Sequence, residues 1–184
     1  MRDLFLDGLP ILDALEVSGS TAATARWINC DQSSVSRAYR KVSAQLDLHF
    51  NKDDGAYQAK NNQALLASLR HASQLRRLAA GVERLQWLHH ADVPLPKAAL
   101  LPPQPLACSW RQEQRSIDLL QRRVLDLALV VQPALPTRSA GGGAIQAIRI
   151  APHQGISALV LDTLSDHASI TGLIRRLSAL LHPL

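Results

Sequence analysis

The sequence is poor in cysteine and contains no long apolar run. Its 184 residues include only Cys30 and Cys108, too few for a disulfide framework or a cysteine-rich zinc site. No apolar run approaches the ~18 residues that span a bilayer. Asp3 and Asp7 interrupt the apolar start that a signal peptide needs. We therefore expect a cytoplasmic protein with no membrane partner.

The sequence also lacks the motifs of common catalytic and metal sites. It has no Gly-x-Ser-x-Gly, no His-Glu-x-x-His and no pattern of paired carboxylates. The glycines at 141–143 are not followed by the Gly-Lys-Ser/Thr of a phosphate loop. His89 and His90 are neighbours that would point apart at a helix end, with no third ligand nearby. Residues 91–184 contain no recognisable set of catalytic residues that would support a small enzyme. We therefore expect that the protein is not an enzyme and binds no cofactor or metal.

What the sequence does contain is a helical pattern in its first half. Residues 9–17, 21–28 and 31–46 are each expected to form a helix, with Asp31 as the N-cap of the third. Cys30 falls in the turn before it, where we expect it to pack as a small apolar residue. Residues 47–60 break the helical period, and their Asp-Asp-Gly turn predicts a small β-hairpin.

The third helix divides into an apolar and a polar face. Apolar residues recur at three- and four-residue steps and are expected to pack inward: Val35, Ala38, Tyr39, Val42 and Leu46. Polar and basic residues fall on the other side: Gln32, Ser33, Ser36, Arg37 and Arg40. Residues 32–46 contain no acid. Such a face suits a helix in the major groove of DNA, although a solvated helix surface would show the same pattern.

A long helix is predicted over residues 61–88. At about 1.5 Å per residue it would be roughly 40 Å long, more than a domain of this size can cover. Its apolar stripe therefore predicts a dimer interface, with packing inside one subunit as the alternative. The residues expected at the interface are Leu65, Leu69, Leu75, Val82 and Leu85.

The second half begins with a linker that holds five prolines within residues 91–105. The remaining pattern of short strands and helices predicts a small α/β unit. The expected elements are a strand at 106–110, a helix at 112–123, strands at 125–131 and 158–161, and a helix at 169–181.

The run of residues 19–42 resembles the N-terminal winged helix-turn-helix of LysR-type transcriptional regulators. The Gln-Ser-Ser-Val-Ser-Arg string of residues 32–37 carries the likeness most specifically, and the resemblance extends over the first 90 residues. It implies an α+β protein with three parts. These are a winged helix-turn-helix in residues 1–60, a dimerisation linker helix in 61–90 and a truncated α/β effector-like domain in 91–184.

The resemblance also implies roles for particular residues. It assigns groove contacts to Gln32, Ser33, Ser36 and Arg37, and the face of the helix adds phosphate contacts by Arg40 and Lys41. In the wing, Lys52 is the nearest basic group to the position of the family's arginine, although a gap-free register places Asp53 there.

The sequence departs from the family at several positions. Thr21 stands at an aromatic-type position, Ala22 replaces the Thr that caps the second helix, and Asp47 stands where the family has a glycine after the recognition helix.

Residues 106–131 and 158–181 resemble elements of the family's periplasmic-binding-protein-like effector domain. About 90 residues provide one lobe at most, so we expect the glycines at 141–143 to mark a missing second lobe. No small-molecule effector is expected in an incomplete cleft.

The function implied is a homodimeric, sequence-specific transcriptional regulator whose partners are double-stranded DNA and a second copy, with tetramers left open. The rival is a degenerate regulator that serves as a heterodimerising interaction module without DNA binding.

Overall fold

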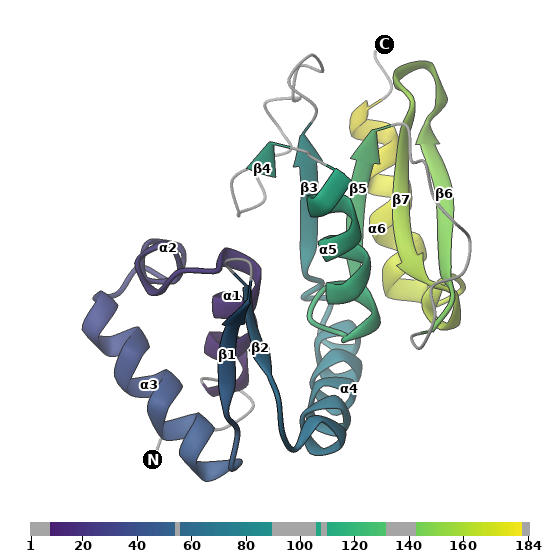
Figure 1. Cartoon of the computed structure of the whole chain (residues 1–184). Helices are drawn as coiled ribbons and strands as arrows, with labels where there is room; N and C mark the ends of the chain where they lie inside the picture. Colours follow the sequence, from purple (N-terminus) through teal and green to yellow (C-terminus); the bar gives the residue numbers. More distant parts are fainter. Residues whose placement is uncertain (1–7, 54–55, 90–105, 108–109, 132–142, 182–184) are drawn as a thin grey trace. The chain divides into compact units, whose positions relative to one another are not determined.

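The chain forms two compact units, Met1–Ser73 and Gln74–Leu184, in a computed structural model (Figure 1). The structure describes residues 8–53, 56–89, 106–107, 110–131 and 143–181. The predicted linker at 91–105, Cys108, His90 and the glycines at 141 and 142 lie outside these residues. In the described part of the chain, no helix is both long and apolar enough to cross a membrane.

The first unit contains three short helices followed by an antiparallel hairpin, as expected. The elements are α1 (Leu9–Ser18), α2 (Thr21–Trp27), α3 (Gln32–Gln45), β1 (Phe50–Asp53), β2 (Ala56–Ala59) and the start of α4 (Gln63–Ala79). Gly19 ends α1 with a φ of 65°, a conformation that costs glycine little. Ser20 caps α2 by accepting a hydrogen bond from Ala23 N. Asp31 is the N-cap residue of α3, although its side chain makes no capping bond.

The core of the first unit joins α1, α3, the hairpin and α4. One buried cluster combines residues from all of these elements: Leu9, Leu12, Val42, Leu46, Leu48, Ala59 and Leu66. A smaller cluster lies where α1, α2 and α3 meet: Ile11, Ala25, Val35 and Ala38. The helical periodicity therefore identified the inward face of α3 correctly.

The second unit is built on a five-stranded sheet with the order β4-β3-β5-β7-β6. Strand β3 runs parallel to β4 and β5, whereas β7 runs antiparallel to β5 and β6. The strands are β3 (Leu85–His89), β4 (Leu106–Ala107), β5 (Leu127–Val131), β6 (Ile145–Ala151) and β7 (Ile156–Leu161).

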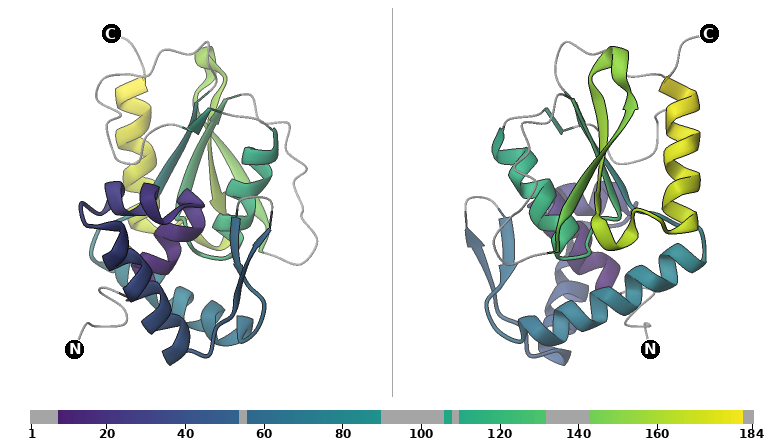
Figure 2. Two further views of the ribbon diagram at one scale, coloured as in Figure 1. Left: turned by 60° about the vertical axis from the view of Figure 1, so that its left-hand side comes forward. Right: turned by 90° about the vertical axis from the view of Figure 1, so that its right-hand side faces the viewer.

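Helices cover both faces of this sheet. Figures 1 and 2 show α5 (Trp110–Gln121) on one face and α6 (Ala168–Leu181) on the other. Residues 127–130 of β5 and all of β7 are buried, as strands covered on both faces must be. Together the two units confirm the predicted mixed content of helix and sheet.

The predicted long helix is shorter than expected. Helix α4 ends at Ala79, and Leu85–His89 form strand β3 rather than a further helical turn. Its 17 residues correspond to about 26 Å. Gly81, with a φ of 65°, follows the last turn and ends the helical path. The expectation of a helix to residue 88 is therefore wrong, as is the placement of His89 at a helix end.

Strand β6 was not predicted, and the strand expected at 158–161 is the end of the longer β7. The helix expected at 112–123 is present as α5, which begins at Trp110. Of the strand expected at 106–110, Leu106–Ala107 form β4 and Trp110 belongs to α5, while residues 108 and 109 lie outside the described part of the chain.

Asp126 is fully buried and binds several polar groups of the second unit. Its carboxylate accepts hydrogen bonds from Arg77 Nη2 at 2.8 Å, Gln74 Nε2 at 3.0 Å and the backbone N of Arg84 at 2.8 Å. Arg123 Nη1 donates in turn to Gln74 Oε1 at 2.6 Å. A buried carboxylate is tolerated when charged and polar donors compensate it in this way.

Candidate nucleic-acid interface

The turn between α2 and α3 fixes the start of the candidate recognition helix. Asn29 adopts a φ of 51°, which asparagine accepts more readily than most residues. Cys30 N donates to Ala25 O at 3.0 Å, and Ser34 N donates to Asp31 O at 2.9 Å. The first bond closes the turn that follows α2, and the second closes the first turn of α3.

Helix α3 presents the expected polar face to solvent. Val35, Ala38 and Val42 are buried. On the other side, Ser36 is half-buried, and the remaining predicted contact residues on this helix are exposed: Gln32, Ser33, Arg37, Arg40 and Lys41. The structure therefore brings the predicted residues of α3 together on one accessible face. Their contacts with DNA stay predictions.

The exposed charges on this helix have one sign. Arg37, Arg40 and Lys41 are exposed within α3, which contains no acid. Arg37 Nη2 donates to Ser34 Oγ at 3.3 Å, one turn earlier in the helix. Asp31 and Asp47 are the exposed acids next to its two ends. A row of cations along a helix is suited to phosphate oxygens.

Gln32 makes a contact with α2 that the sequence alone does not predict. Its Nε2 donates to Thr21 Oγ1 at 2.8 Å and so joins the first residue of α3 to the first residue of α2. Two side chains eleven positions apart become neighbours because the turn after α2 folds α3 back against it.

The corner between α1 and α2 is held by hydroxyl groups. Ser18 Oγ lies 2.7 Å from Thr24 Oγ1, and Thr24 Oγ1 donates to Ser20 O at 2.9 Å. Ser18 Oγ also donates to Ser20 O at 3.0 Å. Since Thr24 is fully buried, this network fixes the N-terminal end of α2 on the body of the unit.

Tyr39 connects α3 to the hairpin. Its ring meets Phe50 edge-on at a centroid distance of 5.4 Å and Tyr57 at 6.0 Å. Burial, together with the nearby Tyr57, raises the pKa of Tyr39. The aromatic contacts hold the hairpin against the helix that carries the polar face.

Lys52, the basic residue expected to contact phosphate from the wing, lies in β1 opposite Tyr57. Its side chain lies outside what the structure describes, so its predicted role stays a prediction.

Asp47 ends the turn after α3 in a left-handed conformation. Its φ is 48°, which explains why a glycine would suit this position. Asn62 Nδ2 donates to Asp47 O at 3.0 Å and to Leu46 O at 3.1 Å, and Asn61 Nδ2 also donates to Asp47 O. Asn61 Oδ1 accepts from His49 N at 2.6 Å. Two asparagine side chains thus close the turn that leads from α3 into the hairpin.

The expected dimer residues divide between two environments. Leu65, Leu75 and Val82 are exposed to 44%, 50% and 61%. Leu69 instead packs against the core of the first unit. Leu85 is half-buried in β3 opposite Leu127. Leu69 and Leu85 are therefore less accessible than the other three residues, and the dimer contacts of all five stay predictions.

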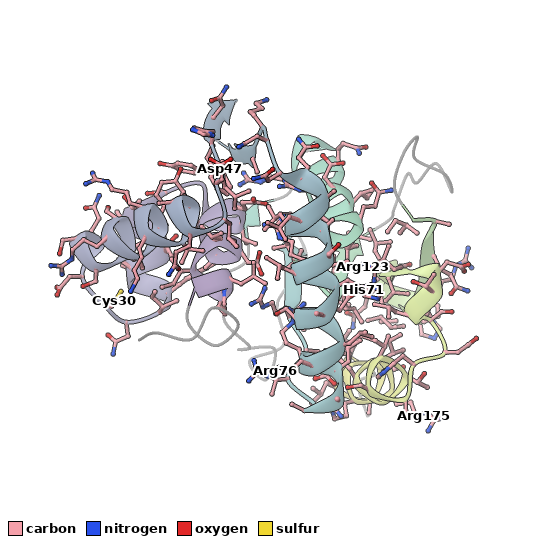
Figure 3. All side chains as sticks on the ribbon, turned by 90° about the horizontal axis from the view of Figure 1, so that it is seen from below. Cys30, Asp47, His71, Arg76, Arg123 and Arg175 are labelled. Carbon is pink, nitrogen blue, oxygen red and sulfur yellow. The ribbon has the colours of Figure 1, made fainter. Side chains whose placement is uncertain are left out.

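The outer face of α4 retains a narrower stripe. Leu65, Ala72, Leu75 and Ala79 are exposed and follow one another at the spacing of a helical seam. His71 and Arg76, labelled in Figure 3, are exposed beside it.

Cys30 is exposed rather than packed as a small apolar residue, and Figure 3 shows its sulfur at the surface. The expectation of an apolar environment for it is therefore wrong. Among the described residues, no three histidine, cysteine, aspartate or glutamate side chains form a group able to hold a metal ion.

No protein-family model and no curated protein matches the chain. Among solved structures, it is similar to a full-length OxyR variant from Pseudomonas aeruginosa, with a TM-score of 0.41 and 16% identity over 80% of this chain and 55% of that one. For ArgP from Mycobacterium tuberculosis the TM-score is 0.37, with 15% identity over 82% of this chain and 53% of that one. For CbnR, named as a LysR family transcriptional regulator, the TM-score is 0.31, with 17% identity over 78% of this chain and 55% of that one.

The matches are LysR-type regulators, not enzymes. The likeness extends over about 80% of this chain at low sequence identity. The chain spans about half the length of these structures.

Proposed function

We propose that this protein is a sequence-specific DNA-binding transcriptional regulator of LysR type that acts in the cytoplasm as a homodimer. The observation that carries the proposal is the division of α3. Val35, Ala38 and Val42 anchor one side of the helix in the core, and the other side presents amide, hydroxyl and guanidinium groups to solvent. A helix held in this way can enter the major groove as a rigid element.

The residues of α3 divide by chemistry into two roles. Gln32, Ser33, Ser36 and Arg37 lie on its first two turns, where base edges are read in helix-turn-helix complexes. Arg40, Lys41 and the wing residue Lys52 supply charge for backbone phosphates, which position a protein but carry no sequence information.

Dimerisation is assigned to the exposed stripe of α4 that contains Leu65 and Leu75. Two copies would place two α3 helices in successive major grooves, about one turn of DNA apart. The operator is then a pseudo-palindrome. No small-molecule effector is assigned, since the second unit is expected to supply only one lobe.

The test is fluorescence anisotropy with fragmented genomic DNA, titrated from low to physiological salt, for the wild type and Arg37→Ala. We expect tight, salt-dependent binding that survives competitor DNA, and a loss of about 1–3 kcal/mol in the variant at the selected site. Arg175→Ala is the matched control, because it removes an exposed arginine from α6 instead of α3. Equal binding by Arg37→Ala and wild type would refute the role of this helix.

A second candidate is a protein-interaction module without DNA binding. Asp47, which repels phosphates, is exposed just after α3, and the apolar stripe on α4 is available to a different partner chain. Failure of the wild type to bind DNA at low salt would favour this reading. The search would then turn to partners of α4.

A further inference from the structure

Gln32 is exposed at the first position of α3, yet its side chain is held. An exposed glutamine ordinarily samples many rotamers, and it loses that freedom when it binds. Here Nε2 donates to Thr21 Oγ1 at 2.8 Å. The amide is therefore placed before any ligand arrives.

Thr21 is itself in a fixed position. As a β-branched residue it has a restricted χ1. It follows Ser20, whose hydroxyl caps α2, and the network of Ser18 and Thr24 anchors the same end of the helix. The backbone bond from Cys30 N to Ala25 O closes the turn between α2 and α3, and Ala25 and Val35 share a buried cluster. The restraint on Gln32 thus leads back to the core of the first unit.

The hydrogen bond also orients the two ends of the amide. Oγ1 of Thr21 accepts from the nitrogen of Gln32, so the carbonyl oxygen of the amide lies on the other end. One N–H and the carbonyl oxygen remain to bind a base. In the major groove, a carbonyl acceptor beside an N–H donor complements N6 and N7 of adenine.

We infer that Thr21 is a positioning residue that sets the base preference at one operator position by fixing the amide of Gln32. The inference rests on the proposed DNA binding and adds a residue outside the recognition helix to the determinants of specificity. Thr21 would need no contact with the base itself, since its effect passes through Gln32.

The test compares Thr21→Val, which keeps the shape and removes the hydroxyl, with Thr21→Ser, which keeps the hydroxyl. Gln32→Ala first identifies the operator position that Gln32 reads, as the one where base discrimination falls. Affinities are then measured for the four bases at that position. We expect Thr21→Val to reduce discrimination there about three- to tenfold, as befits one hydrogen bond, and Thr21→Ser to retain it. Non-specific affinity and the salt dependence should stay unchanged.

A double variant separates positioning from a structural role. In the Gln32→Ala background, Thr21→Val should have no further effect on discrimination, because the residue on which it acts is gone. Circular dichroism and thermal midpoints check that the variants fold. If Thr21→Val does not fold, the same measurements are made with Thr21→Ala.

Three results would overturn the inference alone: an unchanged preference in Thr21→Val, an equal loss of affinity on every sequence, or additive effects in the double variant. A wild type that selects no sequence would overturn the proposed function, and the inference with it.

Discussion

Arg70 and Asp13 form a buried ion pair, with Nε 2.9 Å from Oδ1 and both side chains only 2% exposed. Glu16 lies on the same face of α1, and its Oε1 is 2.9 Å from Arg70 Nη2. Burial lowers the pKa of Arg70, but the two carboxylates outweigh it and raise the pKa above its usual value. The carboxylates therefore favour the charged form of Arg70, and α4 is joined to α1 by charge as well as by the apolar core.

Replacement of Arg70 by alanine should destabilise the protein by about 3–5 kcal/mol, because two buried carboxylates lose their common partner. Urea unfolding followed by circular dichroism measures the change. Arg76→Ala, which removes an exposed arginine from the same helix, is the control and should cost no more than about 0.5 kcal/mol. Similar losses in the two variants would contradict the role of the buried cluster.

Replacement of the whole cluster should cost less than the loss of Arg70 alone. In the triple variant Asp13→Leu, Glu16→Leu, Arg70→Leu no buried charge remains, and packed apolar side chains are often neutral or stabilising at such sites. The same urea titration compares it with Arg70→Ala. A triple variant less stable than the single one would show that the ion pairs contribute net stability.

Replacement of Asp47 by glycine should stabilise the protein by about 0.5–1 kcal/mol, since the φ of 48° favours glycine. The stronger bonds from Asn61 and Asn62 go to the backbone carbonyl of Asp47, which glycine retains. Asp47→Ala, which removes the same charge without easing the backbone, should be less stable than Asp47→Gly. Thermal unfolding distinguishes them, and equal midpoints would exclude backbone conformation as the cause.

Introduction of charge on the outer face of α4 should separate the proposed dimer. Leu65→Glu combined with Leu75→Glu places two carboxylates in the stripe, and a dissociation constant at least tenfold higher is expected. Sedimentation velocity gives the oligomeric state. Leu180→Glu is the matched control, because Leu180 is a leucine on α6 with a similar exposure of 51%. Dissociation by the control, or none by the double variant, would place the interface elsewhere.

Arg40→Ala should weaken DNA binding by about the same factor on every sequence and lower the slope of log affinity against log salt by about one. Arg37→Ala should instead relax base preference. Anisotropy titrations at several salt concentrations measure both. Sequence-dependent loss with an unchanged slope in Arg40→Ala would move Arg40 from phosphate contact to base reading.

The first 60 residues were largely predictable because their structure follows from local rules. The apolar spacing of Val35, Ala38 and Val42 fixes the buried face of α3 wherever that helix packs. Ser20 begins α2 by capping it, and the hairpin follows from a turn between two extended runs. The polar face of α3 could be identified for the same reason, because it lies on the side of the helix opposite the apolar face.

The end of α4 was mispredicted although a local signal was present. Val82 and Leu85 continue the spacing of the leucine stripe beyond the helix, whereas Gly81, which adopts a φ of 65°, ends it. Apolar spacing alone does not show whether Leu85 continues a helix or begins a strand. Pairing of Leu85 with Leu127, 42 positions later, decides that it begins one.

The sequence by itself determined helices α1, α2 and α3, the apolar and polar faces of α3 and the hairpin, because caps, turns and periodicity act over a few residues. Only the tertiary structure decided that Arg70 would be buried between Asp13 and Glu16, that Asp126 would gather Arg77 and Gln74, and that Thr21 would hold Gln32. These contacts join residues 11 to 57 positions apart. From the sequence, a charged side chain is predicted to be exposed, because burial of a charge is tolerated only when an opposite charge is buried beside it. Only the fold shows which opposite charge that is.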